Sequence, residues 1–321
     1  MFLKNFNNKF ILSLIEEINL SQKNFFFFYV DHYITNRHLI IKTKSKTKKK
    51  YFGIRFLINE KDNTNYFGFN FSILNEKKAY EVLSEISLAP KMIFFGRSSL
   101  ISKNYLITEW INGKNLYDEI KKNKKSNIKK IGIKLINRIL DIKEKKLKVN
   151  KSINSININT FKKDIIKRIN SKIFIKYYKN TKDLRNEIQN YNFLETEQCY
   201  VCYDQHPKNI IVKGKKYFLF DFDYFHYGYL ETEFIPIFLD LIAAFSKNKL
   251  KDIDFFRSYL KRKNIKLENE YFFLLTHYIN AILKHETKIE KNAKTKINIY
   301  VKAIKQMVRS KKIIYPKIKW N

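Results

Sequence analysis

Cysteine is scarce in this chain of 321 residues, and its 2 cysteines do not make a disulfide framework. They stand at positions 199 and 202 with CxxC spacing, but no second cysteine pair accompanies them. The surrounding segment is β-rich, and residues three apart on a strand point to opposite faces, so both sulfurs cannot grip one metal ion. We therefore predict that Cys199 and Cys202 are small buried residues without a zinc or redox role.

Acidic residues are also few, because 30 Asp and Glu stand against 64 Lys and Arg, for a formal net charge of +34. Such an excess invites a nucleic-acid or anionic-membrane interpretation. The lysines are spread along the whole chain, which favours a general compositional bias over one basic binding stripe. Nucleic-acid binding is therefore not the expected function. A basic binder of anionic surfaces stays as a rival hypothesis, and it predicts steeply salt-dependent binding to phosphate polymers.

Long apolar runs are absent. Residues 25–30 are apolar for only six positions, far short of the roughly 20 that span a membrane. Residues 10–12 are followed almost at once by Glu16 and Glu17, so no export signal is predicted and the cytoplasm is the expected compartment. With 45% hydrophobic and 16% aromatic residues, and only 7 Gly and 4 Pro, the sequence predicts a folded chain without a flexible linker.

The first hundred or so residues predict a helix followed by a twisted antiparallel sheet. Ala79, Val82, Leu83 and Ile86 recur at helical spacing and give one apolar stripe. The expected strands are 37–42, 51–58, 92–95 and 105–110, with a helix over 75–86.

Beyond residue 110 the pattern becomes mainly helical. Apolar residues recur every three or four positions from Ile128 to Ile142, and a second, Lys-rich helix is expected over 160–176. A β-rich segment interrupts at 200–224, and helices resume from about Ile235. The predicted organisation is an N-terminal lobe at 1–110, a hinge at 111–117 and a helical C-terminal lobe at 118–321.

Asp204, Asn209 and Asp221 carry the strongest chemical signal. Asn209 follows Asp204 by five positions, and Asp221 follows Asn209 by twelve. This spacing is typical of phosphoryl transfer, where one carboxylate orients the attacking hydroxyl while an amide oxygen and a second carboxylate hold Mg²⁺. We predict Asp204 as the catalytic residue and Asn209 and Asp221 as the metal ligands.

The segments 210–212 and 217–220 predict a β-hairpin around a Lys-Gly-Lys-Lys turn. This hairpin would bring Asn209 and Asp221 together in space. Asp and Asn are also common in turns between strands, so a purely structural origin is the alternative. The combination of the spacing with an apolar hairpin favours the functional interpretation.

Arg55 and Glu76 form a second constellation. Arg55 lies in the expected strand 51–58, and Glu76 lies on the inward stripe of the expected helix. A carboxylate on an inward stripe requires a cationic partner, and Arg55 is the long cation of the neighbouring strand. The pair would aim the guanidinium at nucleotide phosphates, as the strand lysine and helix glutamate do in protein kinases. The alternative is an exposed Arg and a Glu favoured by the helix dipole.

These residues resemble motifs of the choline kinase and aminoglycoside phosphotransferase superfamily, and bacterial choline kinase-like proteins above all. The similarity runs in order from about residue 34 to 245. The similar motifs are Ile34-Thr35-Asn36-Arg37, Gly53-Ile54-Arg55, Asn75-Glu76, Leu88-Ala89-Pro90-Lys91, Thr108-Glu109-Trp110-Ile111-Asn112-Gly113, Asp204-Gln205-His206-Pro207-Lys208-Asn209 and Asp221-Phe222-Asp223-Tyr224.

The resemblance implies an α+β, two-lobed protein-kinase-like fold, with a small antiparallel-sheet N-lobe and a larger, mainly helical C-lobe. It implies ATP and Mg²⁺ as cofactors and a small-molecule hydroxyl as acceptor, on an amino alcohol such as choline or on a sugar or aminoglycoside. The residues implied to contact the nucleotide are Thr35, Asn36, Arg55, Glu76, Glu109 and Ile111. The expected substrate contacts are Asp223, Tyr224, Tyr227 and Glu231, because aromatic faces and carboxylates hold a cation.

The chain departs from the family pattern in three places. Cys202 stands where the family has His, and Tyr33 and Ile34 replace two glycines of the phosphate turn. No Trp-x-x-Trp pair occurs in the carboxy-terminal helices, where Phe272, Phe273, His277 and Tyr278 stand instead. These departures keep a second hypothesis open, namely a pseudokinase or scaffold that retains the fold without the chemistry.

Overall fold

The computed structural model describes residues 7–21, 25–34, 38–58, 73–122, 127–144, 155–203, 206–222, 224–242, 245–286 and 292–316. These residues divide into two compact units. Unit 1 holds the described parts of Met1–Asn63 and Asn70–Glu119, together with Lys208–Phe225. Unit 2 holds the described parts of Ile120–Pro207 and His226–Asn321. The segment Lys208–Phe225 thus groups with the amino-terminal sheet, and the lobe boundaries set out above stay a prediction.

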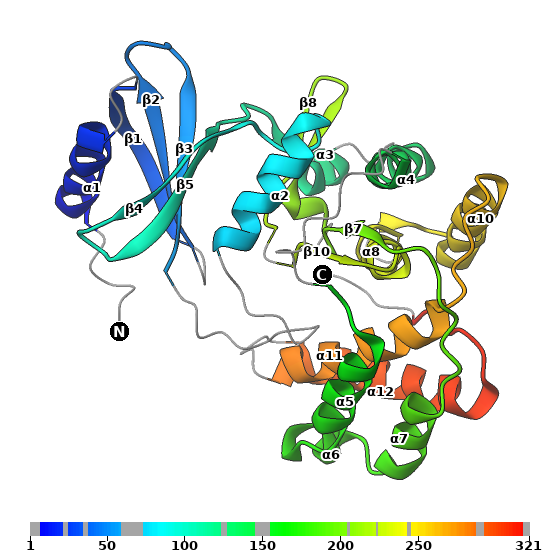
Figure 1. Ribbon diagram of the computed structural model, residues 1–321. Helices are drawn as coiled ribbons and strands as arrows, with labels where there is room; N and C mark the ends of the chain where they lie inside the picture. Colours follow the sequence, from blue (N-terminus) through cyan, green and yellow to red (C-terminus); the bar gives the residue numbers. More distant parts are fainter. Residues whose placement is uncertain are drawn as a thin grey trace. The chain divides into compact units, whose positions relative to one another are not determined.

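Unit 1 is built on a five-stranded antiparallel sheet in the order β1-β2-β3-β5-β4 (Figure 1). Its elements are α1 (Asn8–Ser21), β1 (Phe27–Ile34), β2 (His38–Ser45), β3 (Tyr51–Leu57), α2 (Ile73–Glu85), β4 (Met92–Ser98) and β5 (Lys103–Glu109). A second, three-stranded sheet joins β6 (Lys114–Asn115) to the hairpin of β8 (Ile210–Lys213) and β9 (Lys216–Leu219). The predicted strands, helix and hairpin are confirmed.

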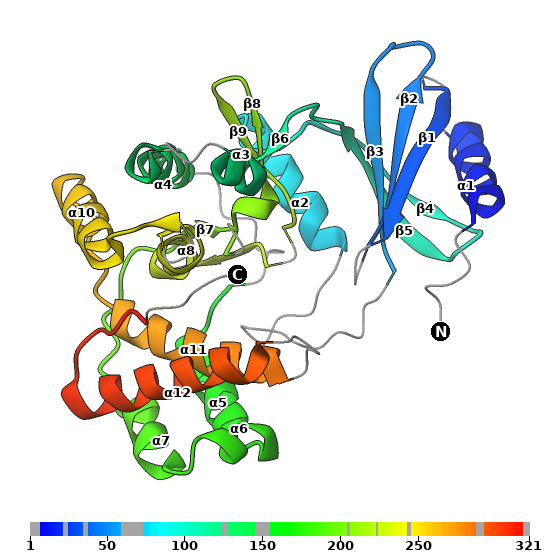
Figure 2. The same cartoon turned by 180° about the vertical axis from the view of Figure 1, so that it is seen from behind.

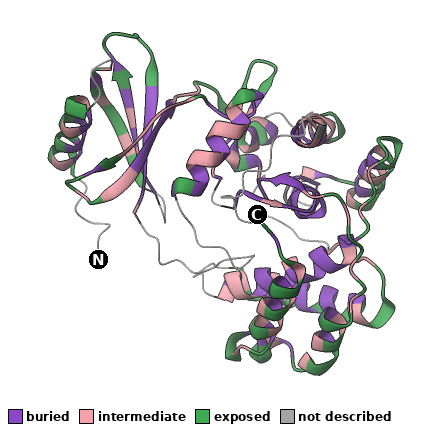
Figure 3. Cartoon of the chain, viewed as in Figure 1, coloured by how far each residue is buried: buried purple, intermediate pink, exposed green. Residues whose placement is uncertain are grey.

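One face of the five-stranded sheet is covered by α1. Ile11, Leu14 and Ile18 of this helix are fully buried against alternate residues of the strands, including Ile41 and Ile54. Because side chains alternate across a strand, Gly53 and Arg55 must then point to the other face. Figure 3 shows this pattern, with buried residues along the middle of the sheet and exposed residues at the β2–β3 tip. The packing of the core therefore determines that Arg55 lies on the face of β3 opposite α1.

Unit 2 is mainly helical. After α3 (Leu116–Lys122), its elements are α4 (Ile128–Glu144), α5 (Ile158–Ile169), α6 (Lys172–Tyr177), α7 (Thr181–Gln189), β7 (Cys199–Val201), β10 (His226–Gly228), α8 (Glu231–Pro236), the π-helix Ile237–Ile242, α10 (Lys249–Arg262), α11 (Glu270–Glu286) and α12 (Ala293–Ser310). The strands β7 and β10 pair antiparallel. In Figure 2, α11 and α12 lie against α5 and α6, and the contacts between these elements agree.

The expected helix over 160–176 is wrong in one respect, because it is two helices. α5 ends at Ile169, and the backbone N–H of Asn170 closes it by bonding to the Ile166 carbonyl. Ser171 then caps α6, its hydroxyl accepting a hydrogen bond from the Phe174 N–H. A good N-cap residue inside a helical pattern starts a new helix, and the apolar periodicity did not reveal it. Among the described helices, none combines the length and apolar character that a bilayer crossing requires.

Candidate active site

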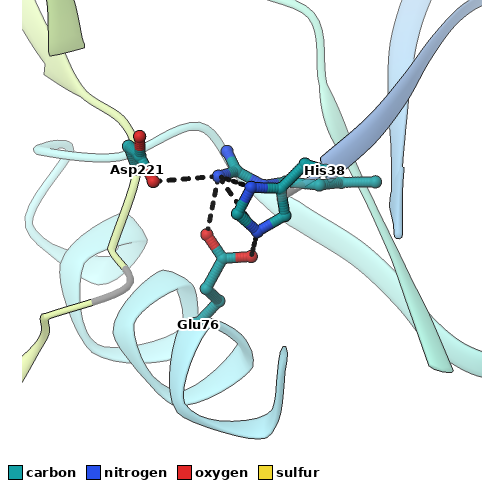
Figure 4. A network of polar contacts seen from close by, with 4 residues as sticks. His38, Glu76 and Asp221 are labelled. Carbon is teal, nitrogen blue, oxygen red and sulfur yellow. Dashed lines mark hydrogen bonds and ion pairs between the residues drawn. The ribbon is translucent and has the colours of Figure 1, made fainter. Parts of the chain in front are cut away.

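Arg55 is the centre of a polar cluster within unit 1, and Figure 4 labels its neighbours His38, Glu76 and Asp221. Its Nη2 atom lies 3.0 Å from a carboxylate oxygen of Glu76 and 3.0 Å from a carboxylate oxygen of Asp221. His38 approaches the same nitrogen, with 3.2 Å between Nη2 and Nδ1. Arg55 comes from β3, Glu76 from α2 and Asp221 from the chain just after β9. One guanidinium thus joins three segments that are far apart in sequence.

Glu76 lies at the buried end of this cluster and is only 1% exposed. Burial raises the pKa of Glu76, but the Arg55 guanidinium and His38 lower it more, so the net pKa lies below the usual value of a carboxyl. Glu76 is therefore a carboxylate that its contacts with Arg55 and His38 keep ionised inside the protein. The ion pair expected from the inward stripe is present, while its function as a phosphate clamp stays a prediction.

A pH dependence of stability follows from Glu76. Because its folded pKa is depressed, the ion pair stabilises the protein fully above the unfolded value of 4.5 and loses its effect as the pH falls through the folded pKa. Glu76→Gln should therefore lower the free energy of unfolding by about 3 kcal/mol near neutral pH. The difference from the wild type should be smaller at about pH 3, because below 4.5 the unfolded wild type takes up a proton that the folded protein, with its lowered Glu76 pKa, resists.

Urea unfolding at the two pH values measures this effect. The matched control is Glu81→Gln, which removes the exposed pair with Lys77 on the same helix. Such a surface pair contributes little, so the control should change stability by less than about 1 kcal/mol. A Glu76→Gln deficit that is the same at both pH values would contradict the linkage.

His38 is a site residue that the sequence did not reveal. It is 3% exposed at the start of β2, and its Nε2 lies 3.5 Å from Glu76. Ile40 pairs directly with Arg55, and His38, two residues before Ile40 on β2, points to the same face of the sheet. A signal was available, because a polar residue at an inward position of a strand requires a partner. His38 orients both members of the ion pair.

The hairpin after Asn209 places Asp221 beside Arg55. The Phe220 N–H donates to the Asn209 carbonyl at 2.9 Å, which brings together the chain at the two predicted metal ligands. The Leu219 N–H donates to the Leu88 carbonyl at 2.7 Å and ties the hairpin to the turn after α2. Asp221 itself has φ +64°, a left-handed backbone that Asp tolerates better than most residues. The local fold thus presents a half-exposed carboxylate next to a cation.

Trp110 separates β5 from the predicted hinge at 111–117. Trp110 donates its N–H to the Tyr51 carbonyl at 3.0 Å, and Glu109 donates its N–H to the Lys91 carbonyl at 2.9 Å. A Cβ on Gly53 would stand 3.4 Å from the Trp110 ring, so the indole lies against the bare backbone of β3. The ammonium of Lys42 lies 5.0 Å from the centre of this ring. Trp110, the residue before the predicted hinge, therefore packs against the Arg55 face of the sheet.

Four predicted site residues fall outside the described residues, namely Thr35, Asn36, Asp204 and Asp223. The residues that precede two of them are described. Tyr33, the last residue but one of β1, lies near the cluster: burial raises its pKa, and the smaller effects of Arg55, which lowers it, and Asp221, which raises it, leave it raised. Tyr203 precedes Asp204 and donates its backbone N–H to Glu233 at 2.9 Å. The predicted roles of the four residues stay predictions.

Cys199 begins the short strand β7 and Cys202 directly follows it, and both are buried free thiols. Burial, and after it the Glu233 carboxylate, raises the pKa of Cys199 to about 12. Burial likewise raises the pKa of Cys202 far above its usual range. Such thiols stay protonated and unreactive at neutral pH, so the prediction of small buried residues is confirmed.

Solved structures resemble the chain over nearly its whole length, although no protein-family description and no curated protein matches it. An ethanolamine kinase from Plasmodium vivax gives a TM-score of 0.59 at 19% identity, over 96% of this chain and 91% of that chain. A choline kinase from Cryptosporidium parvum gives 0.60 at 10% identity, over 95% and 97%. An amicoumacin kinase in complex with AMP-PNP, Ca²⁺ and Ami gives 0.59 at 12% identity, over 96% and 97%. The chain has the fold of these small-molecule kinases.

Within this kinase-like fold, the residues expected to contact the substrate already have protein partners. Tyr224 is 7% exposed, and Glu231 is 1% exposed and accepts the Asn269 N–H at 3.0 Å. The Tyr227 ring packs edge-on against Tyr200, with 5.5 Å between the ring centres. These contacts account for the three described side chains, and their assignment to substrate stays a prediction. Phe272 and Phe273 are buried on α11 as part of the core.

Proposed function

We propose that this protein is an ATP- and Mg²⁺-dependent phosphotransferase that phosphorylates a hydroxyl group of a small molecule. The observation that carries the proposal is the Arg55 cluster. In it, the guanidinium of an arginine on a strand contacts a carboxylate from a helix and a carboxylate that follows a β-hairpin. Phosphoryl transfer depends on positioning and charge stabilisation, and this cluster supplies both on one face of a sheet.

The residues of the site divide the work of the reaction. Asp204 accepts the hydroxyl proton of the acceptor and aligns the oxygen on the γ-phosphorus of ATP. The acceptor oxygen forms a bond to the γ-phosphorus as the bond between that phosphorus and the β-phosphate oxygen breaks, and ADP leaves. Arg55 stabilises the phosphate charge, and Glu76 and His38 hold Arg55 in position. Glu109 and Ile111 present backbone groups to the base, and Thr35 and Asn36 contact the phosphates.

Asn209 and Asp221 have the chemistry of a Mg²⁺ site. An amide oxygen and a carboxylate are the hard oxygen donors that this ion takes, usually together with phosphate oxygens and water. Asp221 is 38% exposed at its side chain and pairs with Arg55, so it is an accessible and charged ligand. When bound, Mg²⁺ neutralises charge on the transferred phosphate. A ligand set of this kind supports nucleotide chemistry over a purely structural ion pair.

The acceptor is proposed by class only, as an amino alcohol such as choline or as a sugar or aminoglycoside hydroxyl. The solved structures with this fold include kinases named for ethanolamine, choline and amicoumacin. The burial of Tyr224 and Glu231 in this chain gives no preference for a cationic head group. A screen across hydroxyl compounds is therefore the right test.

The screen measures ADP release with choline, ethanolamine, thiamine, simple sugars and aminoglycosides. We expect at least one compound to stimulate release about tenfold or more over the acceptor-free rate, and chelation of Mg²⁺ to abolish the stimulated part. The pseudokinase hypothesis would be favoured if ATP bound in a Mg²⁺-dependent way, read as a thermal shift, but no acceptor stimulated the release of ADP. Absence of both binding and release would contradict the proposal.

A further inference from the structure

Aromatic rings and lysines alternate on one face of the sheet near the β2–β3 tip. Phe27 and Phe52 are buried in the core that α1 covers. Because side chains alternate across a strand, Phe28 and Tyr51 point to the opposite face, where they are 44% and 40% exposed. Lys44 pairs in register with Phe28 on one side and with Tyr51 on the other. One row across β1, β2 and β3 thus reads ring, cation, ring.

Phe26 and Lys46 extend this row toward the tip. The Lys46 N–H donates to the Phe26 carbonyl at 2.9 Å, and the rings of Phe26 and Phe28 meet edge to face with 5.5 Å between their centres. Phe26 is 52% exposed. Exposed apolar groups that are contiguous, rather than scattered singly, mark interaction sites. The tip face is the name used here for Phe26, Phe28, Lys42, Lys44, Lys46 and Tyr51.

The charge of the tip face is almost entirely positive. Residues 42–50 contain six lysines and no Asp or Glu. Within the described part of the chain, Glu109 is the one carboxylate that forms an ion pair with these lysines, 3.9 Å from the ammonium of Lys50. Asp31 stands in register with Lys42 and marks the limit of the face on β1. The tip face therefore attracts an anion.

The rings and the ammonium groups together form a platform. The ammonium of Lys42 lies 4.9 Å from the centre of the Tyr51 ring, and that of Lys44 lies 5.7 Å from it. Both are within the range of cation–π attraction. Residues two apart on a strand, such as Phe26 and Phe28, are about 7 Å apart. One nucleotide of an extended single strand can span that distance.

We propose that the tip face binds single-stranded nucleic acid, with bases stacked on its rings and phosphates at its lysines. This binding function is additional to the proposed phosphotransferase and does not depend on it. The other lysines of the chain are spread along its length, whereas these share one face with exposed rings. In a double helix the bases are stacked on one another, so their faces are not available to the rings.

The tip itself favours a nucleic acid over an anionic membrane. Residues 46–50, at the outer end of the β2–β3 hairpin, are Lys and Thr only. Protein segments that lie in a membrane interface bury apolar side chains below the head groups. Here the rings lie on the face of the sheet, and the outermost residues of the hairpin offer nothing apolar to a bilayer.

The first experiment measures binding of a fluorescein-labelled oligouridylate of about 12 nucleotides by fluorescence anisotropy, without ATP or acceptor. Phe28→Ala and Tyr51→Ala should each weaken binding about tenfold at fixed salt, because each removes one stacking ring. Tyr51→Phe keeps the ring and should stay within about twofold of the wild type. The matched control is Leu20→Ala on α1, which removes an apolar side chain that is 86% exposed. Ring variants that bind as Leu20→Ala does would overturn the proposal.

The second experiment separates the tip face from the general charge of +34. For a single strand, each neutralised phosphate contributes about 0.7 to the slope of log affinity against log salt concentration. Lys44→Gln should therefore reduce the slope by about 0.7, and Phe28→Ala should leave it unchanged. The control Lys9→Gln removes an exposed charge from α1, on the other side of the sheet. Equal effects of the two lysine variants would assign binding to charge alone and overturn the proposal.

The third experiment compares ligands. A duplex of the same length should bind about tenfold or more weakly than the single strand, because its bases cannot stack on the rings. Sedimentation with vesicles of equimolar phosphatidylserine and phosphatidylcholine tests the membrane alternative. Tighter binding of the duplex would overturn the proposal, as would binding of the vesicles without binding of the oligouridylate. The substituted side chains are all exposed, so every variant should keep the melting temperature of the wild type.

Discussion

Replacing Asp204 by Asn should reduce turnover about 10³-fold or more while the protein stays folded. Asn has the shape of Asp and can still accept a hydrogen bond, but it cannot take a proton from the acceptor hydroxyl. Positioned acid–base groups contribute roughly 10²–10⁴-fold to such reactions. Binding of ATP and Mg²⁺ should change little, because the nucleotide contacts assigned to Arg55 and Asp221 are retained.

Asp221→Ala should reduce turnover as strongly as Asp204→Asn does, but it should also affect nucleotide binding. It removes the charged metal ligand and one partner of Arg55, so the Mg²⁺-dependent thermal shift with ATP should vanish as well. The control for both variants is Asp254→Asn on α10, whose side chain is 74% exposed and pairs only distantly with Arg257 at 3.9 Å. Undiminished turnover in purified Asp204→Asn or Asp221→Ala would refute the assignment of the site.

Much of this architecture could be predicted because it depends on short-range patterns. The alternating apolar residues of β3 and the stripe of α2 fixed which faces are inward, and a buried Glu76 then required a cation on the neighbouring strand. The hairpin around Gly214, whose φ is +60°, followed from two apolar runs of matching length. Local periodicity and the cost of an unpaired buried charge were sufficient for these elements.

The rest depends on contacts that no local pattern encodes. Arg55 and Asp221 are 166 positions apart, and only the docking of the hairpin on the turn after α2 brings them together. Glu233 lies two positions after Glu231, a predicted substrate contact, and its carboxylate accepts the backbone N–H groups of Cys202 and Tyr203. Sequence spacing indicates which side chains are available, whereas the partner of a buried carboxylate is decided by tertiary packing.

Arg55 is the position where substitution should separate charge from geometry. Arg55→Met retains much of the side-chain volume but leaves Glu76 buried without its cation, and the loss of phosphate stabilisation should lower kcat/KM for ATP about 10²–10³-fold. Arg55→Lys keeps the charge on a single ammonium, which cannot contact Glu76, Asp221 and His38 as the planar guanidinium does. We expect this variant to lose about tenfold, mostly in the KM for ATP.

Steady-state kinetics with varied ATP, at saturating Mg²⁺ and acceptor, measures both effects. Arg97→Met is the matched control, because Arg97 is an exposed residue of β4 in the same sheet and should leave the rate within about twofold. Urea unfolding of each variant shows whether a loss reflects the folded site. If folded Arg55→Met matched the wild type in kcat/KM while Asp204→Asn was inactive, the catalytic aspartate would stand and the phosphate clamp would lie elsewhere on the sheet. The three residues around the guanidinium would then form a structural cluster that joins the hairpin to β3 and α2.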